Sequence, residues 1–365
     1  MYPALAVLQA LSGDKAGGSN RPKPQVLWVG GVGGMEADLV KRKGVPFETI
    51  SAAGVHGVGM RALPGNLWQL GRGYFQASRV LHRFRPDVLF FTGGYLAVPM
   101  ALAGRRIPTL LYVPDIEPGL ALKALARFAD RIAVSAEQAR DYFPTWQAAR
   151  LHVSGYPLRP ELKSWQKQAA CQELGLNPEI PSLLVFGGSK GARSINRALL
   201  AVLPELLSEM QVLHISGKLD WAEVEAAQTA LDGSGAERYR PFPYLHTQRM
   251  GAALAAADLV ISRAGASTLG EFPFFGLPAI LVPYPYAWRY QKVNAQYLQE
   301  RGAAVIVEDA DLAVQLLPLV RDLMHNPQRR SEMRAAMRAL AHPDAAGAIA
   351  DLLQDLAAKH NQERM

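Results

Sequence analysis

Cysteine is almost absent from this chain of 365 residues, in which Cys171 is the single example. One cysteine excludes an internal disulfide and a cysteine-based metal cluster, and it fits a reducing compartment. The eight histidines show no metal-ligand spacing, and none is followed by the acidic partner of a hydrolase triad. From these absences we expect neither a metal nor a cofactor.

An uninterrupted apolar span is also missing. The stretch 88–104 carries no charge, but Gly93, Gly94 and Pro99 interrupt it, which indicates a buried strand, a turn and a helix start. The first residues lack the basic region of a secretory signal. We therefore expect a protein that is at most peripheral to a membrane.

The formal net charge of +7 points to an anionic partner, which is a phosphorylated substrate, a membrane surface or nucleic acid. The basic residues are dispersed, with neither an aromatic-interleaved RNA motif nor a zinc-finger spacing, so we expect no nucleic-acid partner.

One basic segment, 61–85, interleaves arginines with large apolar side chains. It is either an amphipathic helix whose apolar face packs on the core, or a patch that lies on an anionic membrane, and the pattern leaves both open. The residues concerned are Arg61, Leu67, Trp68, Leu70, Arg72, Tyr74, Phe75, Arg79, Arg83 and Arg85.

Apolar runs alternate with helical stretches along the whole chain. Continuous apolar strands separated by helices indicate parallel sheets covered on both faces, so we predict an α/β fold with two doubly wound, Rossmann-like domains. We place them at 1–157 and 158–344, with a C-terminal helix at about 345–365 that can pack back on the first, and expect ligand in a cleft between them. The runs are 25–29, 88–91, 109–113, 131–134, 151–153, 183–186, 212–215, 259–261, 279–282 and 304–307.

The most informative motif, Gly187 to Arg193, follows the apolar run 183–186 and opens a helical pattern. Backbone N–H groups at a helix start have no intrahelical partner, and glycines let an anion approach, so this order predicts a phosphate site. A second cluster, 262–268 with Glu271, supplies a carboxylate suited to ribose hydroxyls. The phosphate site and this carboxylate together indicate a nucleotide ligand. The alternative is that Ser267 and Thr268 merely cap a helix.

The motifs, taken in order, resemble the MurG family, which are peripheral GT-B transferases of glycosyltransferase family 28. The resemblance covers nearly the whole chain. It implies inverting transfer of GlcNAc from UDP-GlcNAc to undecaprenyl-diphosphoryl-MurNAc-pentapeptide (lipid I to lipid II) at the cytoplasmic face of the cell membrane, in peptidoglycan synthesis and hence cell-wall growth, cell shape and division. The motifs are 91–95, 187–193 with Asn196, 262–266 with Glu271, 276–278, and Gln291 with Asn294 and Ala295.

The same resemblance assigns roles at the donor site. It implies that Glu271 holds the ribose hydroxyls and that Met250 and Arg263 lie near the uracil. The implied partners are UDP-GlcNAc, a polyprenyl-diphosphate-linked acceptor and an anionic inner membrane surface. The remaining assignments are Arg159, Gly188, Ser189, Lys190, Ala266, Ser267 and Thr268 at the diphosphate, Gln291 and Asn294 at the GlcNAc, and Tyr95 with Asp115 on the acceptor side.

Departures from the family lie mainly in the first half. The family's first strand, and its glycine loop ending in a candidate catalytic histidine, precede a segment matched here by Pro3-Ala4-Leu5-Ala6. We therefore expect the first N-terminal strand to be missing, the activity to be impaired, and the natural gene to encode an upstream strand. Asp115 is the nearest substitute for the base, ahead of Glu117.

Four further interpretations stay open or secondary. The acceptor could be another lipid such as diacylglycerol, or the chain could bind a nucleotide sugar without catalysis. Glycines 30–34 indicate a structural turn. The acidic triplet Asp309-Ala310-Asp311 has no other acid or histidine cluster nearby, so we interpret it as a solvated turn and not a metal site.

Overall fold

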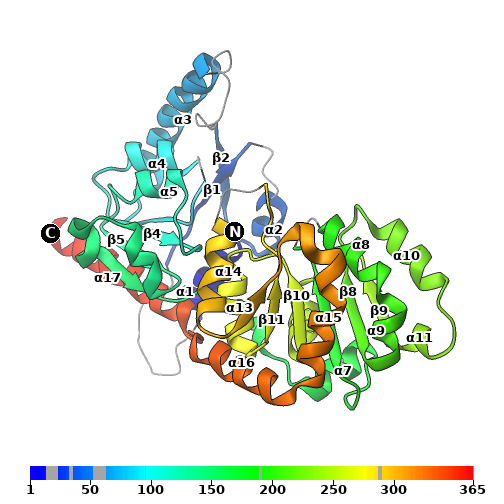
Figure 1. Ribbon diagram of the computed structural model, residues 1–365. Coiled ribbons are helices and arrows are strands. Elements are labelled where there is room, and N and C mark those ends of the chain that lie inside the picture. The colour runs from blue at the N-terminus through cyan, green and yellow to red at the C-terminus, as the bar shows by residue number, and fades with distance from the viewer. Residues whose placement is uncertain are drawn as a thin grey trace. The chain divides into compact units, whose positions relative to one another are not determined.

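The computed structural model describes residues 1–13, 24–32, 36–51, 63–94, 96–188, 191–286 and 290–364. It is an α/β protein in which each paired strand runs parallel to its neighbour (Figure 1). The chain divides into two compact units. Unit 1 comprises Met1–Pro114, Pro118–Pro157 and Asp344–Met365, and unit 2 comprises Asp115–Glu117 and Leu158–Pro343. The predicted class, two α/β parts with parallel sheets, is confirmed.

Unit 2 contains a six-stranded sheet with the order β12-β11-β10-β7-β8-β9. The order reverses between β7 and β10, which are neighbours in the sheet but lie far apart in the sequence. Such a reversal leaves a crevice beyond the carboxyl ends of the two strands, where doubly wound folds bind their ligands. The strands are β7 (Ser182–Phe186), β8 (Gln211–Ile215), β9 (Tyr239–Phe242), β10 (Leu259–Ser262), β11 (Ala279–Leu281) and β12 (Ala304–Ile306).

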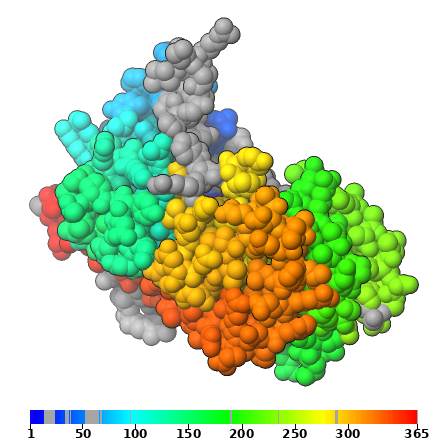
Figure 2. All heavy atoms as spheres, in the orientation of Figure 1, coloured from blue at the N-terminus to red at the C-terminus, as the bar shows by residue number. Residues whose placement is uncertain are grey.

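Helices on both faces explain the continuous apolar strands of unit 2. All five residues of β8 are buried, as are the first four of β7. Helices α15 and α16 contact each other and appear in orange in Figures 1 and 2. The helices are α6 (Pro160–Lys163), α7 (Lys167–Leu174), α8 (Arg193–Ala201), α9 (Leu203–Glu209), α10 (Trp221–Thr229), α11 (Gly233–Arg238), α12 (Thr247–Ala256), α13 (Thr268–Phe275), α14 (Tyr290–Glu300), η3 (Asp309–Asp311), α15 (Leu312–His325) and α16 (Pro327–Ala339).

Unit 1 holds a parallel pair and a separate four-stranded parallel sheet. Among the described residues, β1 pairs with β2 alone, and β3 lies at the edge of its sheet, where it pairs with β4 alone. The charge-free stretch 88–104 forms strand β3, a turn and helix α4, as predicted. The strands are β1 (Trp28–Gly31), β2 (Phe47–Ile50), β3 (Leu89–Phe91), β4 (Thr109–Val113), β5 (Arg131–Val134) and β6 (Leu151–Val153).

The C-terminal helix α17 (Ala345–Arg364) contacts α1 (Tyr2–Ser12) and β4, and so belongs to unit 1. Among the described residues, no helix combines the length and apolarity needed to cross a membrane. The other helices are α2 (Glu36–Arg42), α3 (Leu63–Phe84), α4 (Ala97–Ala103), α5 (Leu120–Leu125), η1 (Glu137–Tyr142) and η2 (Thr145–Arg150).

Candidate active site

Two helices of unit 2 begin beside each other at the carboxyl edge of the sheet. Strands β7 and β10 end in register, with Phe186 opposite Ser262, and each leads through a glycine-containing loop into a helix, α8 or α13. The first N–H groups of each helix lack intrahelical partners and carry the positive end of its dipole. An anion at this edge would therefore meet donors from two helices.

The first loop needs glycine at three positions for two different reasons. A Cβ on Gly187 would lie 2.2 Å from the backbone nitrogen of Ala192, and one on Gly191 would lie 2.2 Å from the carbonyl oxygen of Ser216. Gly188 instead has a φ of +90°, with open space where its Cβ would be. The loop is therefore closely packed at both ends and open at Gly188. The predicted contacts Ser189 and Lys190 lie outside the described residues, as does Tyr95.

The second loop, from Ala264 to Thr268, is a tight turn before α13. The Thr268 hydroxyl donates to the carbonyl of Gly265 at 2.7 Å, and Thr268 is buried. Ser267 occupies the N-cap position without a side-chain capping bond, and Ala266 is only partly buried. Thr268 therefore shapes the turn, whereas Ser267 does not act as the simple cap that the alternative interpretation supposed.

Glu271 lies in the first turn of α13 with its side chain partly buried. Burial raises the pKa of this carboxyl to about 7, against the opposing effects of the Arg159 charge and a hydrogen bond from Ser267. Arg159, the N-cap residue of α6, also donates to the hydroxyl of Thr247 at the start of α12. Met250 follows one turn later on the same helix. The structure thus brings Arg159, Ser267 and Glu271 together, while Thr247 had no motif to reveal it.

Arg263 makes contacts that its predicted place near the uracil did not include. Its guanidinium pairs with Asp309, donates to the Ser194 hydroxyl at 2.8 Å and to the Val282 carbonyl at 3.1 Å, and lies over the Tyr284 ring. The side chain is only 10% exposed. Arg263 therefore ties the second loop to the first turn of α8. Asp309 is an exception within the predicted solvated turn, because its carboxylate is paired and 21% exposed, whereas Ala310 and Asp311 are exposed.

Asn294, predicted to face the GlcNAc, is fully buried. Its amide nitrogen donates to the Asp115 carboxylate at 2.8 Å and to the Ala264 carbonyl at 3.2 Å, and its oxygen accepts from the Ile116 N–H at 3.0 Å. This amide is therefore engaged within the protein, where it holds the short segment Asp115–Glu117 on unit 2. Burial raises the pKa of Asp115, and the bond from Asn294 opposes that shift.

Gln291, the other predicted sugar contact, accepts through Oε1 from the Tyr284 N–H at 3.0 Å. It lies in the first turn of α14 and is partly buried. The amide nitrogen of Gln291 has no partner among the described residues. Gln291 can therefore still donate to a ligand, whereas the amide nitrogen of Asn294 is already engaged.

Known proteins match both halves of the chain. The sequence profile of the glycosyltransferase family 28 N-terminal domain matches residues 1–134, and that of the family 28 C-terminal domain matches residues 182–349. A relative from Roseiflexus sp. (strain RS-1) is 42% identical over 98% of this chain and 92% of its own. The chain belongs to glycosyltransferase family 28. The resemblance expected from the motifs is thereby confirmed.

That family 28 relative is named UDP-N-acetylglucosamine–N-acetylmuramyl-(pentapeptide) pyrophosphoryl-undecaprenol N-acetylglucosamine transferase. A relative with the same name from Desulforudis audaxviator (strain MP104C) is 38% identical, over 98% of this chain and 96% of its own. Among solved structures, Acinetobacter baumannii MurG aligns with a TM-score of 0.73 and 28% identity, over 97% of this chain and 95% of that one. The fold is accordingly of the GT-B class of family 28.

Proposed function

We propose that the chain transfers GlcNAc from UDP-GlcNAc to undecaprenyl-diphosphoryl-MurNAc-pentapeptide, converting lipid I to lipid II with inversion at the anomeric carbon. The observation that carries this proposal is the pair of helix starts at the strand reversal, with Glu271 in the first turn of one of them. A diphosphate suits the helix starts, and a carboxylate suits the ribose hydroxyls. The names of the relatives supply the sugar and the acceptor.

In the proposed reaction the acceptor hydroxyl oxygen bonds to the anomeric carbon while the bond from that carbon to the UDP oxygen breaks. Positive charge develops on the sugar and negative charge on the leaving diphosphate. The starts of α8 and α13, with the Arg159 guanidinium, would stabilise the departing charge without reorganising. Donor contacts in this proposal are Gly188, Ser189, Lys190, Ala266, Ser267 and Thr268 at the diphosphate, Met250 at the uracil and Gln291 at the sugar.

The acceptor proton goes to Asp115 in this proposal. Its raised pKa favours uptake of a proton, and Asn294 fixes one of its oxygens. Asp115→Asn keeps the shape but removes the base, so kcat for GlcNAc transfer should fall by about 10²–10⁴-fold while the Kd for UDP stays the same. Transfer by this variant at the full rate would exclude Asp115 as the base.

Donor binding is tested most directly at Glu271. Each charge-assisted hydrogen bond to a ribose hydroxyl is worth about 1.5–3 kcal/mol, so Glu271→Ala should weaken UDP binding at least tenfold in calorimetry. The exposed Glu300 on α14 provides a matched control, since Glu300→Ala also removes one carboxylate. Equal UDP affinity in the two variants would contradict the ribose assignment. Product analysis with lipid I and with diacylglycerol separates the proposed acceptor from another lipid.

We also place the protein peripherally on the cytoplasmic face of the membrane, through helix α3. Trp68 and Phe75 are 77% and 67% exposed, and Arg72 and Arg79 share their stripe at helical spacing. The opposite face, which includes Ala77, Val80 and Leu81, is buried, so each of the two interpretations of this segment describes a different face of the same helix. An exposed stripe of aromatic and basic side chains suits an anionic lipid surface.

Vesicle binding tests this placement. The protein should bind vesicles containing phosphatidylglycerol at low salt and leave them as salt screens the charges. Trp68→Ala with Phe75→Ala should weaken this binding, whereas Leu219→Ala, which removes another highly exposed apolar side chain, should not. Equal binding to neutral and anionic vesicles would contradict the electrostatic part of the proposal.

A further inference from the structure

Beneath the closing end of the first glycine loop lies a buried chain of polar side chains that the proposed chemistry leaves unused. Tyr239, His214 and Asn196 are each at most 1% exposed. The Tyr239 hydroxyl lies 2.7 Å from Nδ1 of His214, and Nε2 of His214 lies 2.9 Å from the side-chain oxygen of Asn196. The Asn196 amide nitrogen then donates to the Ser216 carbonyl and the Asp220 carboxylate, both at 2.9 Å.

These partners determine which atom donates in each hydrogen bond of this buried series. Because the amide nitrogen of Asn196 spends both hydrogens on Ser216 and Asp220, its oxygen must accept, so Nε2 of His214 carries a proton. Nδ1 of the neutral ring then accepts from the Tyr239 hydroxyl. Burial lowers the pKa of His214 to about 3, with only a partial opposing effect of Asp220, so the ring is neutral at physiological pH.

This series of buried hydrogen bonds reaches Arg193 and the backbone beside Gly191, at the end of the glycine loop. The second oxygen of Asp220 accepts from Nε of Arg193, the first residue of α8, at 2.9 Å. The Ser216 carbonyl, which Asn196 holds, is the atom 2.2 Å from the position that a Cβ on Gly191 would occupy. Buried hydrogen bonds that begin on β9 and β8 and pass through Asn196 of α8 therefore converge on the start of that helix.

We propose that Tyr239, His214 and Asn196 are positioning residues that hold Gly191–Arg193 in the geometry needed by a diphosphate, without touching the ligand themselves. The inference rests on the proposed function, in which this loop receives the diphosphate of UDP-GlcNAc. Donors at a helix start act on an anion only when they are aimed correctly and stay aimed. A buried chain in which each donor has one acceptor provides that rigidity.

Two substitutions of His214 separate its contact with Tyr239 from its contact with Asn196. In His214→Gln the amide nitrogen can stand where Nε2 stands and still donate to Asn196. In His214→Asn the shorter amide reaches only the Nδ1 position, so it keeps Tyr239 and loses Asn196. Both variants are neutral and both lose the ring, so their melting temperatures should fall by similar amounts.

The measurement is the Kd of the full-length protein for UDP and for uridine, which lacks phosphate. His214→Asn should weaken UDP binding about tenfold and leave uridine binding within about twofold. His214→Gln, which loses only the contact with the Tyr239 hydroxyl, should weaken UDP binding no more than about threefold and also leave uridine binding within about twofold. A purely structural role would weaken both ligands alike. Tyr239→Phe, which preserves the ring and removes one hydroxyl, should lower UDP affinity about threefold with uridine unchanged.

Three results would overturn the inference. An unchanged ratio of UDP to uridine affinity in His214→Asn, which includes equal loss of both ligands, would show that the buried hydrogen bonds only stabilise the fold. If the His214 variants do not fold, an unchanged ratio in Tyr239→Phe decides the same question. Failure of the unsubstituted chain to bind UDP would instead remove the proposed function, and the inference with it.

Discussion

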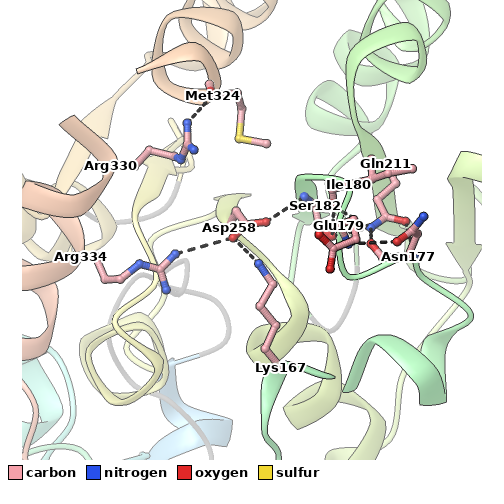
Figure 3. A network of polar contacts seen from close by, with 10 residues as sticks. All are labelled: Lys167, Asn177, Glu179, Ile180, Ser182, Gln211, Asp258, Met324, Arg330 and Arg334. Atoms are coloured by element: carbon pink, nitrogen blue, oxygen red, sulfur yellow. Dashed lines mark hydrogen bonds and ion pairs between the residues drawn. The ribbon is translucent and has the colours of Figure 1, made fainter. Parts of the chain in front are cut away.

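The two edges of the unit 2 sheet are built from the same strands but differ in how their polar groups are used. At the amino edge, Asp258 accepts from the Ser182 N–H at 3.0 Å and from Lys167 at 2.6 Å, with Arg334 at 3.8 Å (Figure 3). Gln211, at the start of β8, donates to the carbonyls of Asn177 and Ile180. These bonds join strand ends to neighbouring loops and close the edge.

The carboxyl edge of the sheet differs in its loops and in the burial of one carboxyl group. Here the strands end in glycine loops, and Glu271 sits where burial raises the pKa of its carboxyl to about 7. Burial makes the ionised form of this carboxyl less favourable. In the proposed function, the amino edge stabilises the fold, whereas the carboxyl edge keeps a buried carboxyl and two glycine loops for the donor.

The largest effect we expect comes from Gly191. Gly191→Ala adds a Cβ that would overlap the Ser216 carbonyl, at a φ of +80°, so the loop must move and UDP affinity should fall by roughly 100-fold or more. Gly302→Ala is the matched control, because its φ of +70° imposes similar backbone strain with open space around the new Cβ. That control should lower the melting temperature and leave UDP binding unchanged. Similar UDP affinities in the two variants would mean that the loop is not a phosphate site.

The opposite pattern is expected at the amino edge. Asp258→Ala leaves the Ser182 N–H without its acceptor, at a cost of about 1–3 kcal/mol, and removes the partner of Lys167. The melting temperature should drop while the Kd for UDP stays constant. Asp322→Ala removes an exposed paired carboxylate instead and should change neither quantity. A large loss of UDP affinity in Asp258→Ala would break the division between the two edges.

Much of this architecture could be predicted because it depends on local patterns. The apolar run 183–186 is β7, and the run 259–261 lies in β10, since a strand covered on both faces must be apolar throughout. Glycine loops after both strands were equally visible, because positive φ and close backbone approach both require glycine. The motifs then sufficed to name the family.

The partners of individual side chains could not be predicted, because they depend on contacts between distant parts of the chain. Asn294 meets Asp115 across 179 residues of sequence, and Arg263 meets Asp309 across 46. A motif indicates which side chains lie near a ligand but not which of them the protein itself engages. For this reason the motifs place Arg263 and Asn294 near the ligand without indicating their contacts within the protein, and no motif indicates the contact between Arg159 and Thr247.

An intermediate effect is expected from the pH dependence of Glu271. With a pKa of about 7, roughly a tenth of the carboxyl is ionised at pH 6 and roughly nine tenths at pH 8. If the carboxylate accepts the ribose hydroxyls, the affinity for uridine should rise up to about tenfold across this range. Uridine is the suitable probe because it has no phosphate that titrates there. Glu271→Gln should abolish the rise, and a flat profile in the unsubstituted chain would contradict the ribose assignment.

The same shift predicts the sign of a stability change. A carboxyl whose pKa is higher in the folded than in the unfolded chain binds more protons when folded, so its favourable contribution is present below about pH 4.5 and is lost as pH rises through about 7. The melting temperature of Glu271→Gln, relative to the unsubstituted chain, should therefore increase between pH 5 and pH 8. A relative decrease would show that the carboxylate is stabilised in the fold.

The smallest effects should come from two ion pairs whose cationic side chains are exposed, one at each edge. Lys167 pairs with Asp258 at the amino edge, and Arg193 pairs with Asp220 at the carboxyl edge, with cationic side chains 45% and 62% exposed. Water and salt screen the exposed cations, and the carboxylates keep the Ser182 N–H and the Asn196 amide as donors, so Lys167→Met and Arg193→Met should lower the melting temperature only slightly. Only Arg193→Met should weaken UDP binding, about two- to threefold, because its partner belongs to the chain that holds the glycine loop. Uridine binding should not change in either variant. Equal UDP affinities in the two variants would mean that neither of these two ion pairs contributes to donor binding. The position of the loop would then depend on its buried groups alone.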